Sequence, residues 1–344
     1  MARTKGYVQL GPTISLYTPP EPEVGELIVL CLWSGATGRL MHDYLSLYKM
    51  NTPNARVLLL TLSVKSMISS YSKQETAMKP AEEAWLQQII SQLIHSGDGT
   101  VSSGVLSPWV DLRVIPRDVL IHELEAQTHR RFLKTHLPLD AMVWKPNLKY
   151  LFVARDGRDT MWSLHHHLYD ATDTFYQMIN DTPGRVGPRL SRPGDNPRDM
   201  FVQLLDGDME PDTAWPFWSH IRGWWEARDQ PNLLLVHFND LKADLEGEMR
   251  RIAKFLEIPE MPVEEWKAAV EHCTFDWMKE HAELAAPPAA SIAWEDGAKS
   301  FIHKGTNGRW KDVLSEDDNR RYLERAKKEL GEECAQWLQR GRLQ

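Results

Sequence analysis

Residues 149–167, KYLFVARDGRDTMWSLHHH, decide the fold that this chain is expected to adopt. The run at 150–154 is short and apolar, which is typical of a buried parallel strand. An Arg-Asp-Gly cluster at 155–157 favours a turn, and a helical pattern follows it. Because a strand end, a tight loop and a helix start direct free backbone N–H groups and the helix dipole at one point, this segment predicts an anion site.

Two side chains of this segment suit a phosphate. Arg155 lies on the predicted loop and Ser163 follows eight residues later, so a guanidinium and a hydroxyl are both at hand. A plainer interpretation is that Arg155 forms a structural ion pair with Asp156 or Asp159. The segment taken alone leaves both interpretations open.

Composition limits the classes of protein to consider. The chain has 344 residues, of which 42% are hydrophobic and 26% charged, so it can form one large α/β domain or two smaller ones. Its net charge of −8 and its pI near 5.9 argue against a nucleic-acid partner. The three cysteines lack metal-ligand spacing, and the apolar run at 27–33 is too short to cross a bilayer. We therefore expect a cytoplasmic protein with no metal and no membrane partner.

Several elements can be predicted outward from this segment. Apolar runs at 27–32 and 56–62 predict a βαβ unit, whereas residues 1–23 show no clear element. Trp85, Ile89 and Leu93 share one face of a predicted helix. The remaining predicted elements are a strand at 110–115, a strand-to-loop segment at 129–140, a long loop at 182–199, a strand at 232–240, a linker or lid at 284–290, a basic loop at 301–311, and a last helix begun by Ser315 and Asp318.

Four segments, read together, resemble the cytosolic-type sulfotransferase family. They are RFLKTHLP at 131–138, KYLFVARDGRDTMWS at 149–163, the stretch from WW at 224–225 to AKFL at 253–256, and FIHKGTNGRWK at 301–311. The resemblance extends over residues 85–340. It implies an α/β fold with a parallel sheet flanked by helices, similar to that of P-loop NTPases. It also implies transfer of a sulfuryl group from 3′-phosphoadenylyl sulfate to a hydroxyl or amine of a small-molecule acceptor.

The resemblance assigns two groups of residues to the nucleotide. Arg155 and Ser163 match residues that hold the 3′-phosphate, and Lys304 and Gly305 match the family's Arg-Lys-Gly loop on the same phosphate. His303 stands where the arginine of that loop is expected. The residues that match contacts elsewhere on the nucleotide are Trp85 near the adenine, Phe238 where a tyrosine is common, and Cys273 and Phe275 in a further turn.

The catalytic candidates are Lys134 and His136. Sulfuryl transfer needs an in-line nucleophile, a base for its proton, and a cation on the leaving oxygen. Residues two apart in an extended segment point to the same side, so His136 can serve as the base while Lys134 stabilises the bridging oxygen. For an isolated Lys-x-His, a histidine that merely hydrogen-bonds in the core would be the better interpretation; beside the other motifs it is not.

Three consecutive histidines, residues 165–167, suggest a metal site that helical geometry disfavours. Successive helical residues are rotated by about 100°, so we expect at most one of the three to point into a cleft.

The family's phosphate loop, Pro-Lys-Ser-Gly-Thr-Thr-Trp, is missing. Residues 79–84 read KPAEEA directly before Trp85, so the glycine and both hydroxyls are absent. Glu82 and Glu83 instead add negative charge where the 5′-phosphosulfate is expected, which is repulsive at any plausible dielectric constant.

The residues before this point are similar, more weakly, to an uncharacterised α/β-hydrolase-like family. That segment lacks the G-x-S-x-G turn which such an enzyme needs. We therefore predict an atypical N-terminal segment at 1–84 and a sulfotransferase-like domain at 85–344. The junction fits either a true fusion or an error in assembling the coding sequence. A small-residue turn at 34–39 is an alternative phosphate loop, although such turns usually serve tight packing.

Three hypotheses for function follow from the sequence. The first is an active or weakly active sulfotransferase, for which a homodimer is also conceivable. The second is a catalytically inactive sulfotransferase-like protein that binds nucleotide weakly or not at all. The third is a hydrolase-like protein that acts through its N-terminal segment.

Overall fold

The computed structural model describes residues 7–11, 14–17, 27–32, 56–61, 80–111, 114–182, 189–206 and 217–342. The chain divides into two compact units, Met1–Ser72 and Lys73–Gln344, which are considered separately. The residues of the predicted turn at 34–39 lie outside the described ranges.

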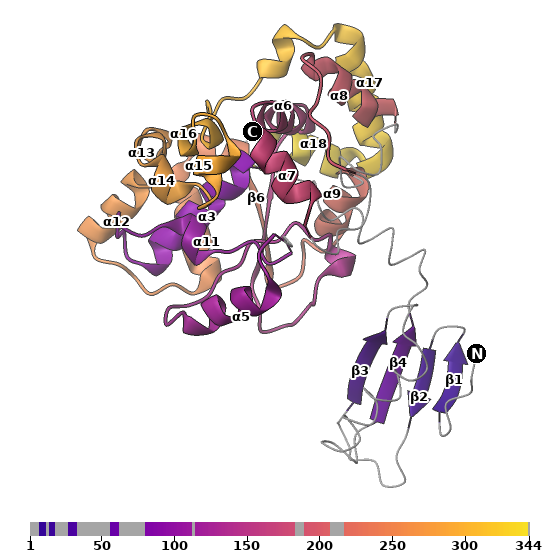
Figure 1. Ribbon diagram of the computed structural model, residues 1–344. Coiled ribbons are helices and arrows are strands. Elements are labelled where there is room, and N and C mark those ends of the chain that lie inside the picture. The colour runs from indigo at the N-terminus through magenta and orange to yellow at the C-terminus, as the bar shows by residue number, and fades with distance from the viewer. Residues whose placement is uncertain are drawn as a thin grey trace. The chain divides into compact units, whose positions relative to one another are not determined.

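The N-terminal unit contains a four-stranded sheet (Figure 1). Its strands, β1 (Tyr7–Gly11), β2 (Ile14–Tyr17), β3 (Leu27–Leu32) and β4 (Arg56–Thr61), lie in the order β1-β2-β4-β3. Strands β3 and β4 are parallel, as predicted, with Leu27 opposite Arg56. The expectation that residues 1–23 form no element is wrong, because β1 and β2 pair as an antiparallel hairpin. Aromatic and β-branched residues in this stretch favour strands, and β4 gives β2 a further partner.

The larger unit is built around two parallel strands, β5 (Tyr150–Ala154) and β6 (Leu233–His237). Alternate residues of β5 enter different cores: Phe152 and Ala154 pack in one cluster, and Val153 packs in the other. Because both faces of this pair are covered, β5 reads as a continuous apolar run. The predicted α/β fold with helices flanking parallel strands is confirmed.

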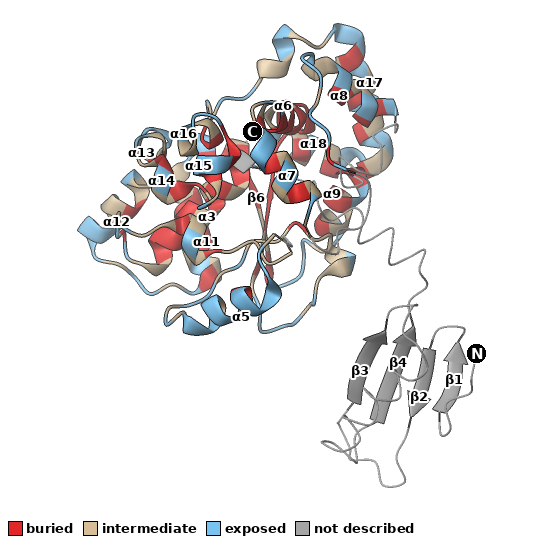
Figure 2. Cartoon of the chain, viewed as in Figure 1, coloured by how far each residue is buried: buried red, intermediate tan, exposed pale blue. Residues whose placement is uncertain are grey.

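Different helices pack against the two faces of the strand pair and form the two hydrophobic clusters. Figure 1 shows α3, α11 and α12 on one side of β6, with α9, α17 and α18 on the other. In Figure 2, buried residues follow these strands and the helix faces turned toward them. The helices of this unit are α3 (Pro80–Ile94), α4 (Ser103–Leu106), α5 (Arg117–Ala126), η1 (Leu139–Ala141), α6 (Gly157–Tyr169), α7 (Asp173–Asn180), α8 (Pro197–Asp206), α9 (Phe217–Glu226), α10 (Phe238–Ala243), α11 (Leu245–Leu256), α12 (Val263–Glu271), α13 (Phe275–Glu280), α14 (Ala282–Ala285), α15 (Ala290–Ala293), α16 (Ala298–Phe301), η2 (Arg309–Asp312), α17 (Glu316–Leu330) and α18 (Glu332–Arg340).

Two of the predicted elements are corrected. In place of a strand at 110–115, residues 110–111 form a turn and α5 starts soon after Pro116, which ends any extended run. The 129–140 segment adds only an isolated bridge from Lys134 to Trp109. None of the helices in the described ranges has the length and apolar character needed to cross a membrane.

The stretch at 284–290 is packed, which corrects its interpretation as a linker or lid. Ala285, Ala286 and Ala290 are buried in the first cluster. A Cβ on Gly104 would lie 2.3 Å from the carbonyl oxygen of Ala286, so small residues on both sides allow a close backbone approach. The small side chains of this alanine-rich segment therefore allow it to pack closely against α4.

Candidate functional site

The turn between β5 and α6 is closed by its own residues. The Asp156 side chain accepts a hydrogen bond from the backbone N–H of Arg158 at 2.9 Å, and the Tyr322 hydroxyl accepts one from Gly157 at 3.0 Å. A Cβ on Gly157 would lie 2.7 Å from both Phe217 and Tyr322, so glycine is needed here. Because these two N–H groups already have acceptors, the anion-binding groups of this segment are chiefly its side chains.

Arg155 extends away from the turn toward the loop at 303–308. Its Nε donates to Asn307 Oδ1 at 3.0 Å and its Nη2 to the carbonyl of Thr306 at 2.9 Å. The guanidinium also lies 4.3 Å from the centre of the Phe238 ring. Asp156 forms its ion pair with Arg158 instead, so Arg155 is left directed at the loop that the resemblance places on the same phosphate.

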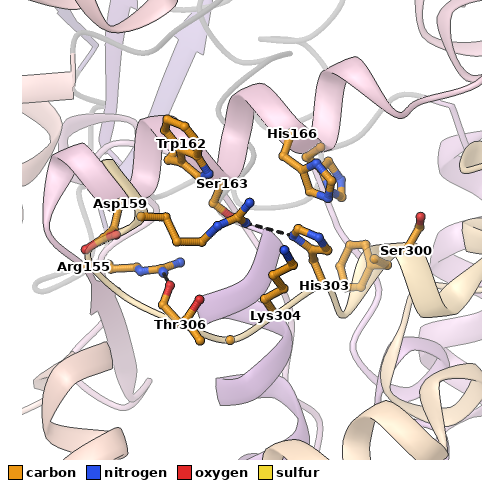
Figure 3. A pocket seen from close by; sticks show the side chains of 13 residues that line it. Arg155, Asp159, Trp162, Ser163, His166, Ser300, His303, Lys304 and Thr306 are labelled. Atoms are coloured by element: carbon orange, nitrogen blue, oxygen red, sulfur yellow. Dashed lines mark hydrogen bonds between the residues drawn. The ribbon is translucent and has the colours of Figure 1, made fainter. Parts of the chain in front are cut away.

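A hollow between α6 and this loop, which we call the cationic hollow, gathers most of the predicted phosphate residues (Figure 3). The space inside it, counted together with open solvent at its mouth, is about 470 Å³. Arg155 and Ser163 line it from β5 and α6, and His303, Lys304 and Gly305 line it from the loop. Its other lining residues are Asp159, Trp162, His166, His167, Ser300, Phe301, Thr306 and Arg309.

Burial and charge shift two titratable groups in this hollow. Burial raises the pKa of Asp159 to about 6, although Arg155 works against the rise. Asp159 also accepts a hydrogen bond from the backbone N–H of Gly308 at 2.7 Å, which ties α6 to the loop. Burial, with His166 and the nearby cations, lowers the pKa of His303 to about 3. The imidazole at position 303 is therefore neutral at physiological pH and does not replace the charge of an arginine.

A second hollow of about 540 Å³ adjoins the first and is mainly apolar; we call it the apolar hollow. Trp85, Phe238 and Phe275 line it, and it shares His303 and Gly305 with the cationic hollow. Its other lining residues are Ala84, Lys242, Met278, Phe301 and Ile302. Three of the four residues that the resemblance assigns to the nucleotide away from its 3′-phosphate are therefore brought together here.

Among the residues predicted to contact the nucleotide, Cys273 lines neither hollow. Its side chain is fully buried in the second hydrophobic cluster. Its backbone carbonyl accepts a hydrogen bond from Trp85 Nε1 at 2.7 Å, so this residue holds the indole that lines the apolar hollow. Gly305, which lines the apolar hollow, occupies a position that only glycine suits. It has φ +60°, and a Cβ would lie 2.6 Å from the Phe275 ring.

The two catalytic candidates meet at one carboxylate. Glu83 Oε2 lies 3.1 Å from Lys134 Nζ and 2.5 Å from His136 Nε2. The Trp109 ring packs against both, 4.2 Å from the His136 ring and 5.1 Å from the Lys134 ammonium. The first turn of α3 thus places an anion where the chemistry was expected to take place.

The neighbouring carboxylate, that of Glu82, lies beside Arg155, which is predicted to bind the 3′-phosphate. Glu82 is fully buried, and its Oε2 lies 3.7 Å from Arg155 Nη1. Lys134 is close enough to α6 to help burial lower the pKa of His167, whose ring lines the cationic hollow. The catalytic candidates and the nucleotide candidates therefore belong to one connected site.

The three histidines of α6 correct the expectation that at most one would face a cleft. His165 Nε2 contacts the carbonyl of Gly194 at 2.7 Å, whereas His166 and His167 both line the cationic hollow. The lining residues of α6 are spaced as i, i+3, i+4, i+7 and i+8 from Asp159, which is one broad helix face, and such a face can include two neighbouring residues. Within the described part of the chain, no group of three or more His, Cys, Asp or Glu side chains is arranged to hold a metal ion.

Sequence reasoning missed several lining residues. Arg309 lies in the basic loop but is not singled out by the sequence patterns, and neither is Lys242. The Lys242 ammonium donates to the carbonyl of Gly305 at 2.7 Å, which no local sequence signal indicates. The excess of positive charge in the 301–311 segment is the sequence feature from which Arg309 could have been identified.

Comparisons with known proteins agree on one family. A family model described as "Sulfotransferase domain" matches residues 83–333. A glycolipid sulfotransferase of Mycobacterium bovis is 27% identical over 281 residues, which is 75% of this chain and 84% of the relative. Human sulfotransferase 1C2 is 26% identical over 268 residues, or 75% of this chain and 80% of the relative.

Two solved structures share the fold. A mouse sulfotransferase, SULT7A1, complexed with PAP superposes with a TM-score of 0.55 at 17% identity, covering 79% of this chain and 90% of that one. Retinol dehydratase in complex with androsterone and the inactive cofactor PAP gives a TM-score of 0.53 at 21% identity, covering 76% and 83%.

Proposed function

Because the chain belongs to the sulfotransferase family, we propose that it transfers a sulfuryl group from 3′-phosphoadenylyl sulfate to a hydroxyl or amine of a small molecule. The observation that carries the proposal is a single connected site. In it, a cationic hollow, an apolar hollow and the Lys134–His136 pair lie around the first turn of α3.

The two hollows fit the two ends of an adenosine bisphosphate. Trp85, Phe238 and Phe275 offer aromatic surface for the base. Arg155, Ser163 and Lys304 offer two positive charges and a hydroxyl for the 3′-phosphate. Structures of two fold relatives that hold PAP support this assignment.

The transfer step needs a base and a cation at the reacting atoms. We propose that His136 Nε2 accepts the proton of the acceptor hydroxyl as that oxygen attacks sulfur. The Lys134 ammonium then balances the negative charge that grows on the bridging oxygen of the leaving nucleotide.

A second candidate function is supported by Glu83. Its carboxylate contacts both Lys134 and His136, so it competes with the sulfuryl group for the cation and with the acceptor for the base. The half-buried carboxylate of Glu83 also repels an incoming polyanion. The second function is therefore a nucleotide-binding protein without transfer activity.

One pair of experiments separates these functions. Calorimetric titration of the full chain with adenosine 3′,5′-bisphosphate measures nucleotide binding. Transfer of radiolabelled sulfate from 3′-phosphoadenylyl sulfate to a panel of phenols, amines and glycolipids measures activity; glycolipids are included because of the mycobacterial relatives. Binding with transfer supports the first function, and binding without transfer supports the second. A chain that binds no nucleotide contradicts both.

Three further properties stay predictions. They are the junction between residues 84 and 85, a homodimer, and a cytoplasmic location. Sedimentation of the full chain over a range of concentrations tests the homodimer directly.

A further inference from the structure

Position 303 lacks a positive charge that another residue of the site can supply. The resemblance expects an arginine there, and the chain has His303. Arg309, six residues later, directs its Nη1 at His303 Nδ1 with a separation of 3.1 Å, marked by the dashed line in Figure 3. A guanidinium is therefore present beside position 303, although it belongs to another residue.

The backbone explains how Arg309 returns to this place. Gly308 has φ +81°, a left-handed conformation that favours glycine, and η2 begins directly after it. Asp159 on α6 accepts the N–H of Gly308 at 2.7 Å, which fixes the turn against the helix. The guanidinium then lies 5.5 Å from the centre of the Trp162 ring, also on α6.

The charge of Arg309 is only partly compensated. It lines the cationic hollow, and among the described residues the carboxylates of Asp159 and Asp312 act on it from beyond ion-pair distance. Burial and the nearby Arg155 lower its pKa, although Asp159 and Asp312 work against the fall, so the charge is held at a cost. Arg155, Lys304 and Arg309 outnumber the one lining carboxylate, Asp159, and such an excess of cations at a half-buried wall is typical of an anion site.

His303 can hold Arg309 only as a neutral imidazole. Its Nδ1 accepts the Arg309 N–H, so that atom carries no proton. The surrounding groups keep it so: the His166 ring lies against it, tilted by 30° with ring centres 3.6 Å apart, and Lys304, Lys279 and Arg309 add positive charge. Asp170 is 3.2 Å from His166 Nδ1 and thereby orients that ring.

We propose that Arg309 binds the 3′-phosphate of the nucleotide in place of the arginine absent at position 303, and that His303 positions it by accepting its N–H. The inference rests on the proposed nucleotide function and adds to it a residue that the family motif does not assign. Arg309 is a binding residue in this scheme, and His303 is a positioning residue.

The test compares two nucleotides and two charge-removing variants. Arg309→Gln should weaken binding of adenosine 3′,5′-bisphosphate at least about tenfold, because a charge-assisted contact is lost. Its affinity for adenosine 5′-monophosphate, which has no 3′-phosphate, should change little. Lys311→Gln is the matched control, since Lys311 is an exposed cation of the same short helix and lines neither hollow.

Rescue separates positioning from folding. Adding His303→Arg to the Arg309→Gln variant should restore bisphosphate affinity to within a few-fold of the parent. His303→Gln, which keeps an acceptor, should bind better than His303→Ala. Circular dichroism and thermal unfolding establish that each variant is folded.

The possible results distinguish failure of the Arg309 proposal from failure of the proposed nucleotide function. If the parent binds the bisphosphate and Arg309→Gln binds it equally well, the inference is overturned and the proposed function stands. Equal losses for both nucleotides also overturn it, because the contact would then not be with the 3′-phosphate. If the parent binds neither nucleotide, both fail together.

Discussion

At the residue scale, the clearest prediction is that Arg155 and Ser163 contribute to binding of the 3′-phosphate. Arg155→Ala should weaken adenosine bisphosphate binding by about 1.5–3 kcal/mol through loss of a charge-assisted contact, and Ser163→Ala should weaken it less. Calorimetric titration measures both losses, with thermal unfolding as the check on folding. Unchanged affinity in both variants would remove the 3′-phosphate assignment.

His136 is the proposed base, and its removal should affect rate more than binding. If the chain transfers sulfate, His136→Ala should slow transfer by about 10²–10⁴-fold while nucleotide affinity changes little. His122→Ala, an exposed histidine on α5, is the control. A His136→Ala protein as fast as the parent would place the base elsewhere, with the histidines at 165–167 examined next.

Asp159 makes stability depend on pH with an unusual sign. Its pKa is raised to about 6 in the folded protein, above its usual value of 3.8, so folding favours the protonated form. Its contribution to stability is therefore present below about pH 4 and is lost as the pH rises through about 6. Asp159→Asn keeps an acceptor for Gly308 and should abolish this loss, which amounts to at most about 3 kcal/mol.

Urea unfolding of parent and Asp159→Asn at pH 4.5, 5.5 and 6.5 measures the effect on the free energy of unfolding. The difference between the two proteins should shift in favour of the variant as the pH rises. A difference that stays constant over this interval would show that Asp159 does not titrate there.

At the element scale, the first turn of α3 limits the proposed activity. A phosphate loop works by directing several backbone N–H groups at one anion and adding a lysine and a hydroxyl. This turn has Glu82 beside Arg155 and Glu83 on Lys134 and His136. Two carboxylates suit the positive end of a helix dipole but oppose an anionic cofactor.

Rewriting residues 79–84 as Pro-Lys-Ser-Gly-Thr-Thr should raise both cofactor affinity and transfer rate. The double variant Glu82→Gln with Glu83→Gln is the matched comparison, because it removes the charges without building a loop. We expect it to recover part of the gain in affinity and less of the gain in rate. An unmodified chain that already turns over as fast as the rewritten one would show that this turn is no defect.

At the scale of the whole molecule, every residue named in the site belongs to the larger unit. The family match also begins at residue 83, after the N-terminal unit has ended. A chain that starts at Lys73 should therefore fold and bind adenosine bisphosphate with the affinity of the full chain. If it binds more weakly, the N-terminal unit contributes, and the turn at 34–39 is the first place to mutate.

The sequence by itself determined the parts of this protein that are local along the chain. The strand, turn and helix from Tyr150 to Tyr169 follow from apolar patterning, and the order of four motifs identifies the family. Arg155, Ser163 and Lys304 could be named from these motifs, because a short segment carries its own backbone geometry and its own chemistry.

Only the tertiary structure decided which groups meet across the chain. Glu83 and His136 are 53 positions apart, yet the packing of α3 brings their side chains to hydrogen-bond distance. Arg309 reaches His303 because a left-handed glycine and a contact to α6 fold the loop back. Strand β2 likewise pairs with β4, which lies far along the chain. Contacts of this kind depend on how the core packs, and no local pattern of residues encodes them.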